Sequence, residues 1–210
     1  MKDDHWIIFP GWNGFRNSNE IWRVELPQPG SLTINWEVIP STLDDAFLEG
    51  VVLDAYAFAH IEPYVYFHAG YSDTHPTGNF ISRVNINEEP LKAEILSPSY
   101  DMPSGRSYHS ITAIGNKLYM FGGHDGEKAL DELWSFDADN EHWEYIEVKG
   151  IKPSSRLGHA ATAHGTNLLI WGGKNGNLLY NDMLMYNVFS KQWAEMEIKS
   201  DLYPPAVEGA

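Results

Sequence analysis

The sequence predicts an all-β fold built from repeated four-stranded antiparallel units. Residues 106–143 and 156–193 align without a gap at a constant offset of 50 residues. An arginine, a histidine, a pair of glycines and a late tryptophan recur in both stretches at this offset. A fixed spacing held by such residues indicates a repeated supersecondary unit.

The first of these two stretches contains four runs of strand-forming residues separated by turn signals. We expect strands at residues 107–113, 117–121, 132–136 and 142–147. The second run carries almost no polar residue, which predicts a strand covered on both faces. Four short antiparallel strands in about fifty residues form one blade of a β-propeller.

The two units resemble the kelch repeat family. In the first copy the resemblance is carried by Pro103-x-x-Arg106-x-x-His109, Leu118-Tyr119-x-Phe121-Gly122-Gly123, Leu133-Trp134-x-Phe136-Asp137 and Trp143. In the second copy it is carried by Pro153-x-x-Arg156-x-x-His159, Leu169-Ile170-Trp171-Gly172-Gly173, Asp182-Met183-x-Met185-Tyr186 and Trp193. The resemblance implies a kelch-type β-propeller. It does not identify a function, because these propellers serve unrelated tasks.

Two weaker copies precede the strong ones. A shift of 112 places Phe9-Pro10-Gly11 on Phe121-Gly122-Gly123, and Trp36 takes the late tryptophan position. This first blade begins at its second strand, so we expect it to lack its innermost strand. The next blade is more divergent, with strands expected at residues 48–59, 64–70, 80–85 and 91–96 and with Ala69 in place of one paired glycine.

We therefore expect a single domain over residues 1–210 with four blades. The approximate blade boundaries are 1–40, 41–98, 99–150 and 151–200, with 201–210 as an extra first strand. Two arrangements remain open. The last segment pairs with the strand at residues 6–9 and closes a four-bladed ring, or the chain is an arc of a larger propeller that further propeller sequence or self-association completes.

Composition excludes several classes of protein. The net charge of −15 argues against nucleic-acid binding, which needs clusters of lysine and arginine. The absence of cysteine excludes disulfides and thiolate sites and suits a reducing compartment. No apolar run is long enough for a signal peptide or a membrane helix, so we expect a cytoplasmic protein that does not bind membranes.

No catalytic, cofactor or metal site is expected. His60, His68 and His75 share no ligand spacing with each other or with nearby carboxylates. Glu127 and Asp131 have the spacing of an iron-binding arrangement found on this scaffold, but Ser135 stands where the histidine is needed. The alternative is a small-molecule or carbohydrate-processing enzyme of the kelch propeller type that uses the central channel.

The leading interpretation is a non-catalytic scaffold for protein–protein interaction. We expect its partner to bind the face formed by the loops between blades and the loops joining second and third strands. Arg106 and Arg156 enter this face and could bind a carboxylate or phosphate, or each could pair with an acid such as Asp101 or Asp125. The candidate partner-binding residues are Arg106, Arg156, Tyr108, His124, Asp125, Lys174, Asn175, Trp12, Phe15 and Tyr71.

The remaining repeat residues are expected to hold the blades. His109 and His159 are expected to form hydrogen bonds with adjacent backbone. Trp134, Trp143 and Trp193 are expected to pack between blades.

Overall fold

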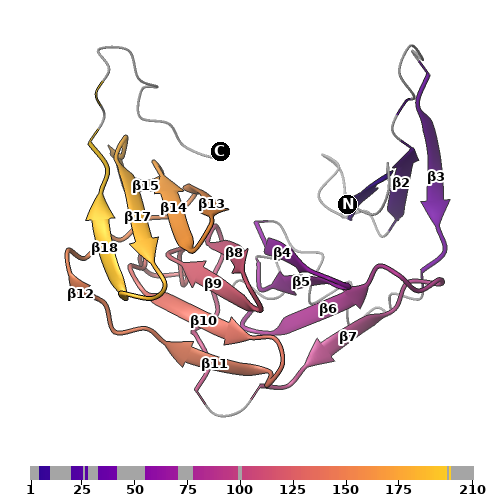
Figure 1. Ribbon diagram of the computed structural model, residues 1–210, viewed down its shortest axis with the longest axis horizontal. Coiled ribbons are helices and arrows are strands. Elements are labelled where there is room, and N and C mark those ends of the chain that lie inside the picture. The colour runs from indigo at the N-terminus through magenta and orange to yellow at the C-terminus, as the bar shows by residue number, and fades with distance from the viewer. Residues whose placement is uncertain are drawn as a thin grey trace.

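The computed structural model describes residues 5–9, 20–25, 27, 33–41, 55–70, 78–98, 101–197 and 199. All regular elements in these ranges are β-strands. The sheets stand around a common axis as an arc with its first and last sheets at the two ends (Figure 1). The described ranges contain no helix that is long and apolar enough to cross a membrane.

Blade 1 is a three-stranded antiparallel sheet in the order β1-β2-β3. Its strands are β1 (His5–Ile8), β2 (Ile21–Glu25) and β3 (Asn35–Ile39). No further strand joins this sheet within the described ranges. In the described part of the chain the blade thus has three strands, in agreement with the expectation from its sequence.

Blades 2 and 3 are four-stranded antiparallel sheets in chain order. Blade 2 contains β4 (Ala57–Ile61), β5 (Tyr64–His68), β6 (Ile81–Asn85) and β7 (Ala93–Leu96). Blade 3 contains β8 (Ser110–Ile114), β9 (Lys117–Phe121), β10 (Leu133–Asp137) and β11 (His142–Tyr145). The expected early part of the first strand of blade 2, up to residue 54, lies outside the described residues.

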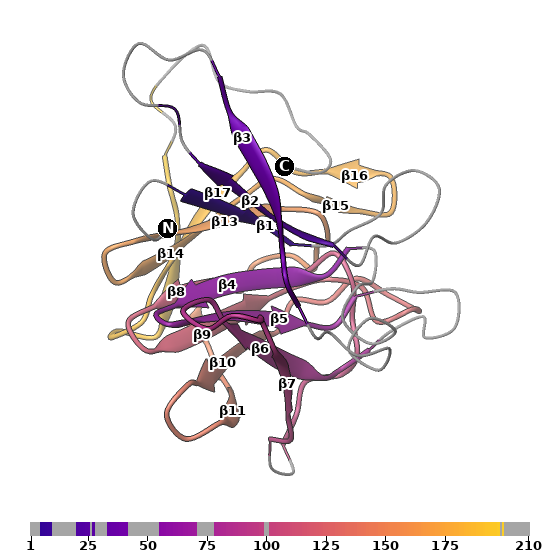
Figure 2. The same cartoon turned by 90° about the vertical axis from the view of Figure 1, so that its right-hand side faces the viewer.

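Blade 4 has the same core of four strands and two additions. The core contains β13 (Ala160–His164), β14 (Asn167–Trp171), β17 (Met183–Asn187) and β18 (Gln192–Glu195). The short strand β12 (Lys149–Gly150) pairs in parallel with β18. A two-stranded hairpin of β15 (Lys174–Asn175) and β16 (Leu178–Leu179) projects on one side of the body (Figure 2). The sequence analysis did not predict these three short strands.

Backbone pairing between blades is repeated along the arc. The chain that leaves blade 3 pairs with the outermost strand of blade 4, so that Gly150 lies opposite Trp193. The chain that leaves blade 1 forms a parallel bridge from Ser41 to Leu91 beside blade 2. Leu91 N donates a hydrogen bond to Pro40 O at 2.9 Å. These links hold the outer rims of neighbouring blades together.

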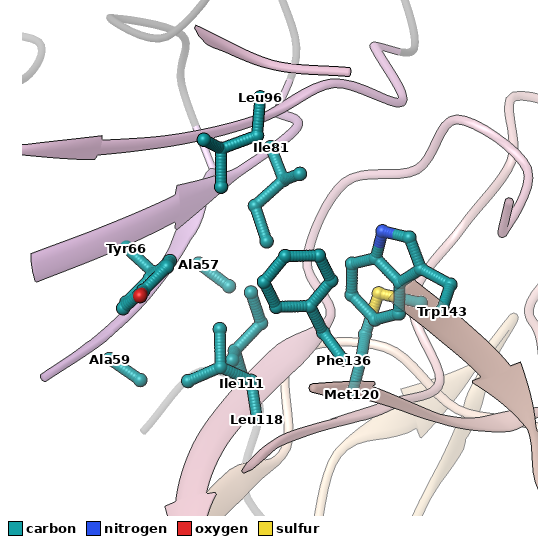
Figure 3. Packing of buried hydrophobic residues seen from close by; sticks show 10 residues of the cluster. All are labelled: Ala57, Ala59, Tyr66, Ile81, Leu96, Ile111, Leu118, Met120, Phe136 and Trp143. Carbon is teal, nitrogen blue, oxygen red and sulfur yellow. The ribbon is translucent and has the colours of Figure 1, made fainter. Parts of the chain in front are cut away.

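The core lies between the blades. Figure 3 shows the cluster between blades 2 and 3, in which Phe136 packs against Trp143 at a ring-centroid distance of 5.2 Å. Trp193 has the same place between blades 3 and 4, 5.3 Å from Phe121. Trp134 packs against the cluster between blades 2 and 3. The predicted packing of Trp134, Trp143 and Trp193 between blades is thus confirmed.

The paired glycines permit a close backbone approach inside blades 3 and 4. Gly123 has a φ of +96°, and a Cβ atom there would lie 2.7 Å from His109 Cβ and 2.8 Å from Ser107 O. Gly173 has a φ of +88°, and its Cβ would lie 2.9 Å from Leu157 O. Only glycine avoids both the left-handed strain and the steric overlap. The motif thus brings the end of the second strand onto the segment that enters the inner strand.

Replacement of Gly123 by alanine should destabilise the protein strongly. Backbone strain and overpacking act together there, so we expect Gly123→Ala to lower the free energy of unfolding by about 3 kcal/mol. Gly115→Ala is the matched control, because Gly115 has a φ of +60° but a Cβ atom there would meet nothing within 4 Å. This control should lower the free energy of unfolding by about 1 kcal/mol. Urea unfolding measures both, and equal losses would contradict the close-approach argument.

Candidate functional site

Arg106 and Arg156 are fully buried and each joins three segments of its own blade. Arg106 Nη2 donates to Glu132 Oε2 at 2.7 Å, and Arg106 Nη1 donates to Gly122 O at 3.2 Å. Arg106 Nε donates to Ser104 O at 3.0 Å. One guanidinium thus holds the entry to the inner strand, the paired glycines and the start of the third strand.

Arg156 repeats this arrangement in blade 4. Its Nη1 and Nη2 atoms donate to the two carboxylate oxygens of Asp182 at 2.7 and 2.8 Å. Nη1 also donates to Gly172 O at 2.9 Å, and Nε donates to Ser154 O at 3.1 Å. A bidentate pair of this kind is both strong and geometrically specific.

The expectation that these arginines are exposed for a partner is therefore corrected. Their side chains are buried, and their donors are used within the blade. The alternative of pairing with an acid is the one observed, but the acids are Glu132 and Asp182, not Asp101 or Asp125. Burial alone would raise the pKa of Glu132, but hydrogen bonds from Arg106 and Trp134 outweigh it and lower that pKa.

The repeat histidines connect neighbouring blades. His109 Nε2 lies 3.0 Å from His68 Nδ1 across the interface of blades 2 and 3. His159 Nε2 lies 2.8 Å from Ser110 Oγ across the interface of blades 3 and 4. The prediction that His109 and His159 bond to adjacent backbone is wrong, because both reach a side chain of the preceding blade.

Burial keeps these imidazoles neutral. It lowers the pKa of His68 to about 3, and the charge of Arg106 adds to the effect. It likewise lowers the pKa of His159 to about 3, with a further contribution from Arg156. The pKa of His109 also lies well below its ordinary value, first because of burial and then because of His68. Neutral side chains in the blade interfaces suit a structural role.

In blades 3 and 4 the two predicted sets of loops meet at one surface. Ser107, on the segment entering blade 3, and His124, after the paired glycines, exchange backbone hydrogen bonds of 3.0 and 2.9 Å. Leu157 and Lys174 exchange two of 3.0 Å in blade 4. We call the surface around these pairs the loop face. It comprises Tyr108, His124, Asp125, Lys174, Asn175, Leu178 and Leu179.

Tyr108 is the aromatic residue that the loop face exposes most clearly. The residue is 49% exposed, and its backbone has a φ of +56°. Tyr108 N donates to Ala55 O at 3.1 Å, and Gly158 N donates to Tyr108 O at 2.9 Å. The backbone of Tyr108 is thus tied to segments of blades 2 and 4, while its ring faces solvent.

The other predicted residues differ in their availability. Asp125 Oδ1 accepts hydrogen bonds from the backbone of Glu127 and Lys128 at 2.9 and 2.8 Å, so this carboxylate shapes its own loop. Asn175 is exposed and donates to Ser155 Oγ at 2.9 Å. His124 and Lys174 are half-buried. The remaining three, Trp12, Phe15 and Tyr71, lie outside the described residues.

The sequence analysis missed two apolar residues on this surface. Leu178 and Leu179 are 59% and 44% exposed. They pair with Asn175 and Lys174 across the β15–β16 hairpin. Two adjacent leucines in a polar, glycine-containing loop were the available signal.

Comparisons with known proteins agree with the fold. The family model described as the KLHDC2/KLHL20/DRC7 Kelch-repeats domain matches residues 53–210, more than half of the chain. Kelch-like protein 25 of Xenopus tropicalis is 40% identical over 53 residues, which are 25% of this chain and 9% of that protein. The tRNA wybutosine-synthesizing protein 2/3/4 of Oryza sativa subsp. japonica is 35% identical over 49 residues, 23% of this chain and 5% of that protein. Tip elongation aberrant protein 3 of Schizosaccharomyces pombe is 39% identical over 49 residues, 23% of this chain and 4% of that protein. The chain thus matches under a tenth of each relative's length.

Removal of one buried guanidinium should destabilise its blade. In Arg156→Met, the carboxylate of Asp182 and the carbonyls of Gly172 and Ser154 lose their donor, so we expect a loss of about 3 kcal/mol in the free energy of unfolding. Lys152→Ala is the control, because Lys152 forms an exposed pair with Asp131. It should change stability by less than about 0.5 kcal/mol. If Arg156→Met changed the free energy of unfolding in urea as little as the control does, the proposed stabilisation of the blade by Arg156 would be contradicted.

Stability should fall in mild acid because of the buried histidines. The pKa of His159 is about 3 in the folded state and 6.5 ordinarily, so the unfolded chain binds the proton first as the pH falls. The contribution of neutral His159 to the free energy of unfolding is therefore complete above pH 6.5 and is lost as the pH falls toward 3. Protonation of His159 in the unfolded chain should by itself lower the free energy of unfolding by about 2 kcal/mol between pH 7 and pH 5.

Urea unfolding at the two pH values tests this expectation. His159→Gln should show a smaller loss between pH 7 and pH 5 than the unmodified protein. His164→Gln, at an exposed position on β13, should keep the full loss. Equal pH dependence in all three proteins would contradict the assignment.

Proposed function

The chain belongs to the kelch repeat family, and from this premise we propose that it is a non-catalytic module that binds a protein partner through its loop face. Kelch repeat domains are typically protein-interaction modules. The finer proposal concerns which surface is used. It rests on one observation, the exposed ring of Tyr108 on a backbone tied to two neighbouring blades.

The chemistry of the loop face suits protein recognition. Tyrosine side chains are frequent hot spots because they offer a large apolar surface with a polar end. Leu178 and Leu179 add exposed apolar surface on the adjoining hairpin. His124, Asp125, Lys174 and Asn175 provide a mixed polar surround, as the rim of a typical interface does.

Hydrogen bonds connect these parts into one surface. Gly158 donates to Tyr108, and its neighbour Leu157 pairs with Lys174. Lys174 lies opposite Leu179 in the hairpin. Since few groups must become ordered on binding, a larger share of the contact energy appears as affinity.

In this proposal Arg106 and Arg156 act as supports for the loop face. From the interior of the blades, they fix the segments that lead into the inner strands, next to Ser107 and Leu157. Their replacement should therefore weaken partner binding only through loss of folding.

Affinity capture with matched variants tests the proposal. The tagged chain and the double variant Tyr108→Ala, Leu178→Ser are incubated with an extract of the organism that encodes the protein, and captured proteins are quantified by mass spectrometry. We expect at least one protein to be captured at least about tenfold less by the double variant, because each side chain is a candidate hot spot.

Phe189→Ala is the control, since Phe189 is 81% exposed and follows β17, whereas the loop-face hairpin precedes β17, so the two lie at opposite ends of this strand. The control should capture the same proteins as the unmodified chain. Unfolding curves of all variants should coincide. Specific capture that the double variant retains in full would refute the loop face as the binding surface.

A further inference from the structure

The β15–β16 hairpin turns at an asparagine followed by a glycine, Asn175-Gly176. Two asparagines of the chain precede a glycine, and the other, Asn13, lies outside the described residues. The hairpin projects from the body (Figure 2), and residues 175–179 are all exposed. A Cβ atom added at Gly176 would meet nothing within 4 Å. The dipeptide therefore has open space around it.

An asparagine before a glycine is chemically labile, because the backbone can displace the side-chain amide. The backbone nitrogen of the following residue attacks the asparagine Cγ atom. A glycine at that position has no side chain to obstruct the attack and allows wide backbone rotation. In a folded protein the reaction also requires that the attacking nitrogen is not held by another hydrogen bond.

Blade 3 holds the corresponding nitrogen in place. Its dipeptide Asp125-Gly126 corresponds to Asn175-Gly176 at the common offset of 50 residues. Gly126 N donates a hydrogen bond to His124 Nδ1 at 3.0 Å. The attacking nitrogen of this loop is thus occupied by a side chain of the same loop.

In blade 4 the corresponding nitrogen has no such partner. Lys174 stands in the place of His124, and a lysine ammonium has no acceptor atom. The hydrogen bonds found among the described residues include none from Gly176 N. Asn175 Nδ2 donates to Ser155 Oγ at 2.9 Å, at an exposed position. Because water readily replaces an exposed bond of this kind, the Asn175 side chain can turn toward Gly176 N.

We propose that Asn175 is a site of spontaneous deamidation in the folded protein. The Gly176 nitrogen loses its proton to a base in solution and forms a bond with Cγ of Asn175. The bond from Cγ to Nδ2 breaks, and the released nitrogen takes up a proton and leaves as ammonia. Water then opens the resulting succinimide ring at either carbonyl, which leaves aspartate or isoaspartate at this position. The reaction consumes water, releases ammonia and requires no oxidant or reductant.

The modification changes the loop face at a defined point. Either product replaces a neutral amide by a carboxylate, on a chain whose net charge is already −15. Isoaspartate also lengthens the main chain, because the peptide then continues through the side-chain carbon. Asn175 lies opposite Leu178, and Lys174 lies opposite Leu179, so the longer main chain disturbs the pairing that positions both leucines. The chemistry proposed for Asn175 does not depend on whether the loop face binds a partner.

Peptide mass spectrometry tests the proposal. The full 210-residue chain is kept in mildly alkaline buffer, and samples taken over time are digested briefly in acid, where deamidation is slow. We expect Asn175 to be deamidated at least about tenfold faster than Asn177, which is exposed in the same hairpin but precedes a leucine. Isoaspartate, identified by electron-induced fragmentation, should be the larger product. The rate should fall in mildly acidic buffer, because the attacking nitrogen must lose its proton.

Two variants in blade 3 isolate the effect of the free nitrogen. Asp125→Asn creates the same dipeptide where His124 holds the nitrogen of Gly126. The new asparagine should react at least about tenfold more slowly than Asn175, since a hydrogen bond must first be lost. Addition of His124→Lys, which copies Lys174 of blade 4, should raise the rate toward that of Asn175.

The chain unfolded in urea provides the reference rate. The folded chain should be deamidated at Asn175 within about tenfold of this reference. If Asn175 stayed intact in the folded chain while the unfolded chain reacted, the proposal would be overturned. Equal rates at Asn175 and at the new asparagine of Asp125→Asn would overturn the role given to the free nitrogen of Gly176.

Discussion

The structure depends on the face-to-face packing of neighbouring sheets. Alternate side chains of β9 point to opposite neighbours. Leu118 and Met120 belong to the cluster with blade 2, whereas Tyr119 and Phe121 belong to the cluster with blade 4. A middle blade is therefore apolar on both faces, and its second strand is a continuous apolar run. The glycine pair, the histidines and the late tryptophans all serve to bring these faces into contact.

The buried arginines connect the packed interior of each blade to the segments that lead into the surface loops. Each guanidinium reaches the entry segment, the glycine carbonyl and the acid that begins the third strand, as Arg156 does with Ser154, Gly172 and Asp182. Because these segments lead directly into the loops, a constraint inside the blade fixes the loop backbone. A surface built on such supports loses little conformational entropy on binding, which is the physical reason to expect recognition there.

Sequence reasoning succeeded where the fifty-residue offset carried the information. It predicted the four strands of blades 3 and 4 and the packing of the tryptophans between blades, since both follow from the residue pattern that recurs at this offset. It failed for the partners of Arg106 and His109, because these contacts cross the blade or the interface. The partner acids were nevertheless visible as a recurrence, as Glu132 and Asp182 are also separated by the common offset. The exposure of Leu178 depends on hairpin pairing, which a loop of mixed composition does not reveal.

The end blades show what the shared interfaces contribute. Tyr119 and Phe121 are 8% and 0% exposed under blade 4, whereas Leu169 and Trp171, their equivalents in blade 4, are only half-buried. At the other end, Trp6 and Trp36 are 54% and 55% exposed on the outer face of blade 1. The same residue types that form the core between blades thus form apolar surface at the ends. Since each blade is stabilised mainly by its neighbours, the interfaces on either side of blade 3 hold the arc together.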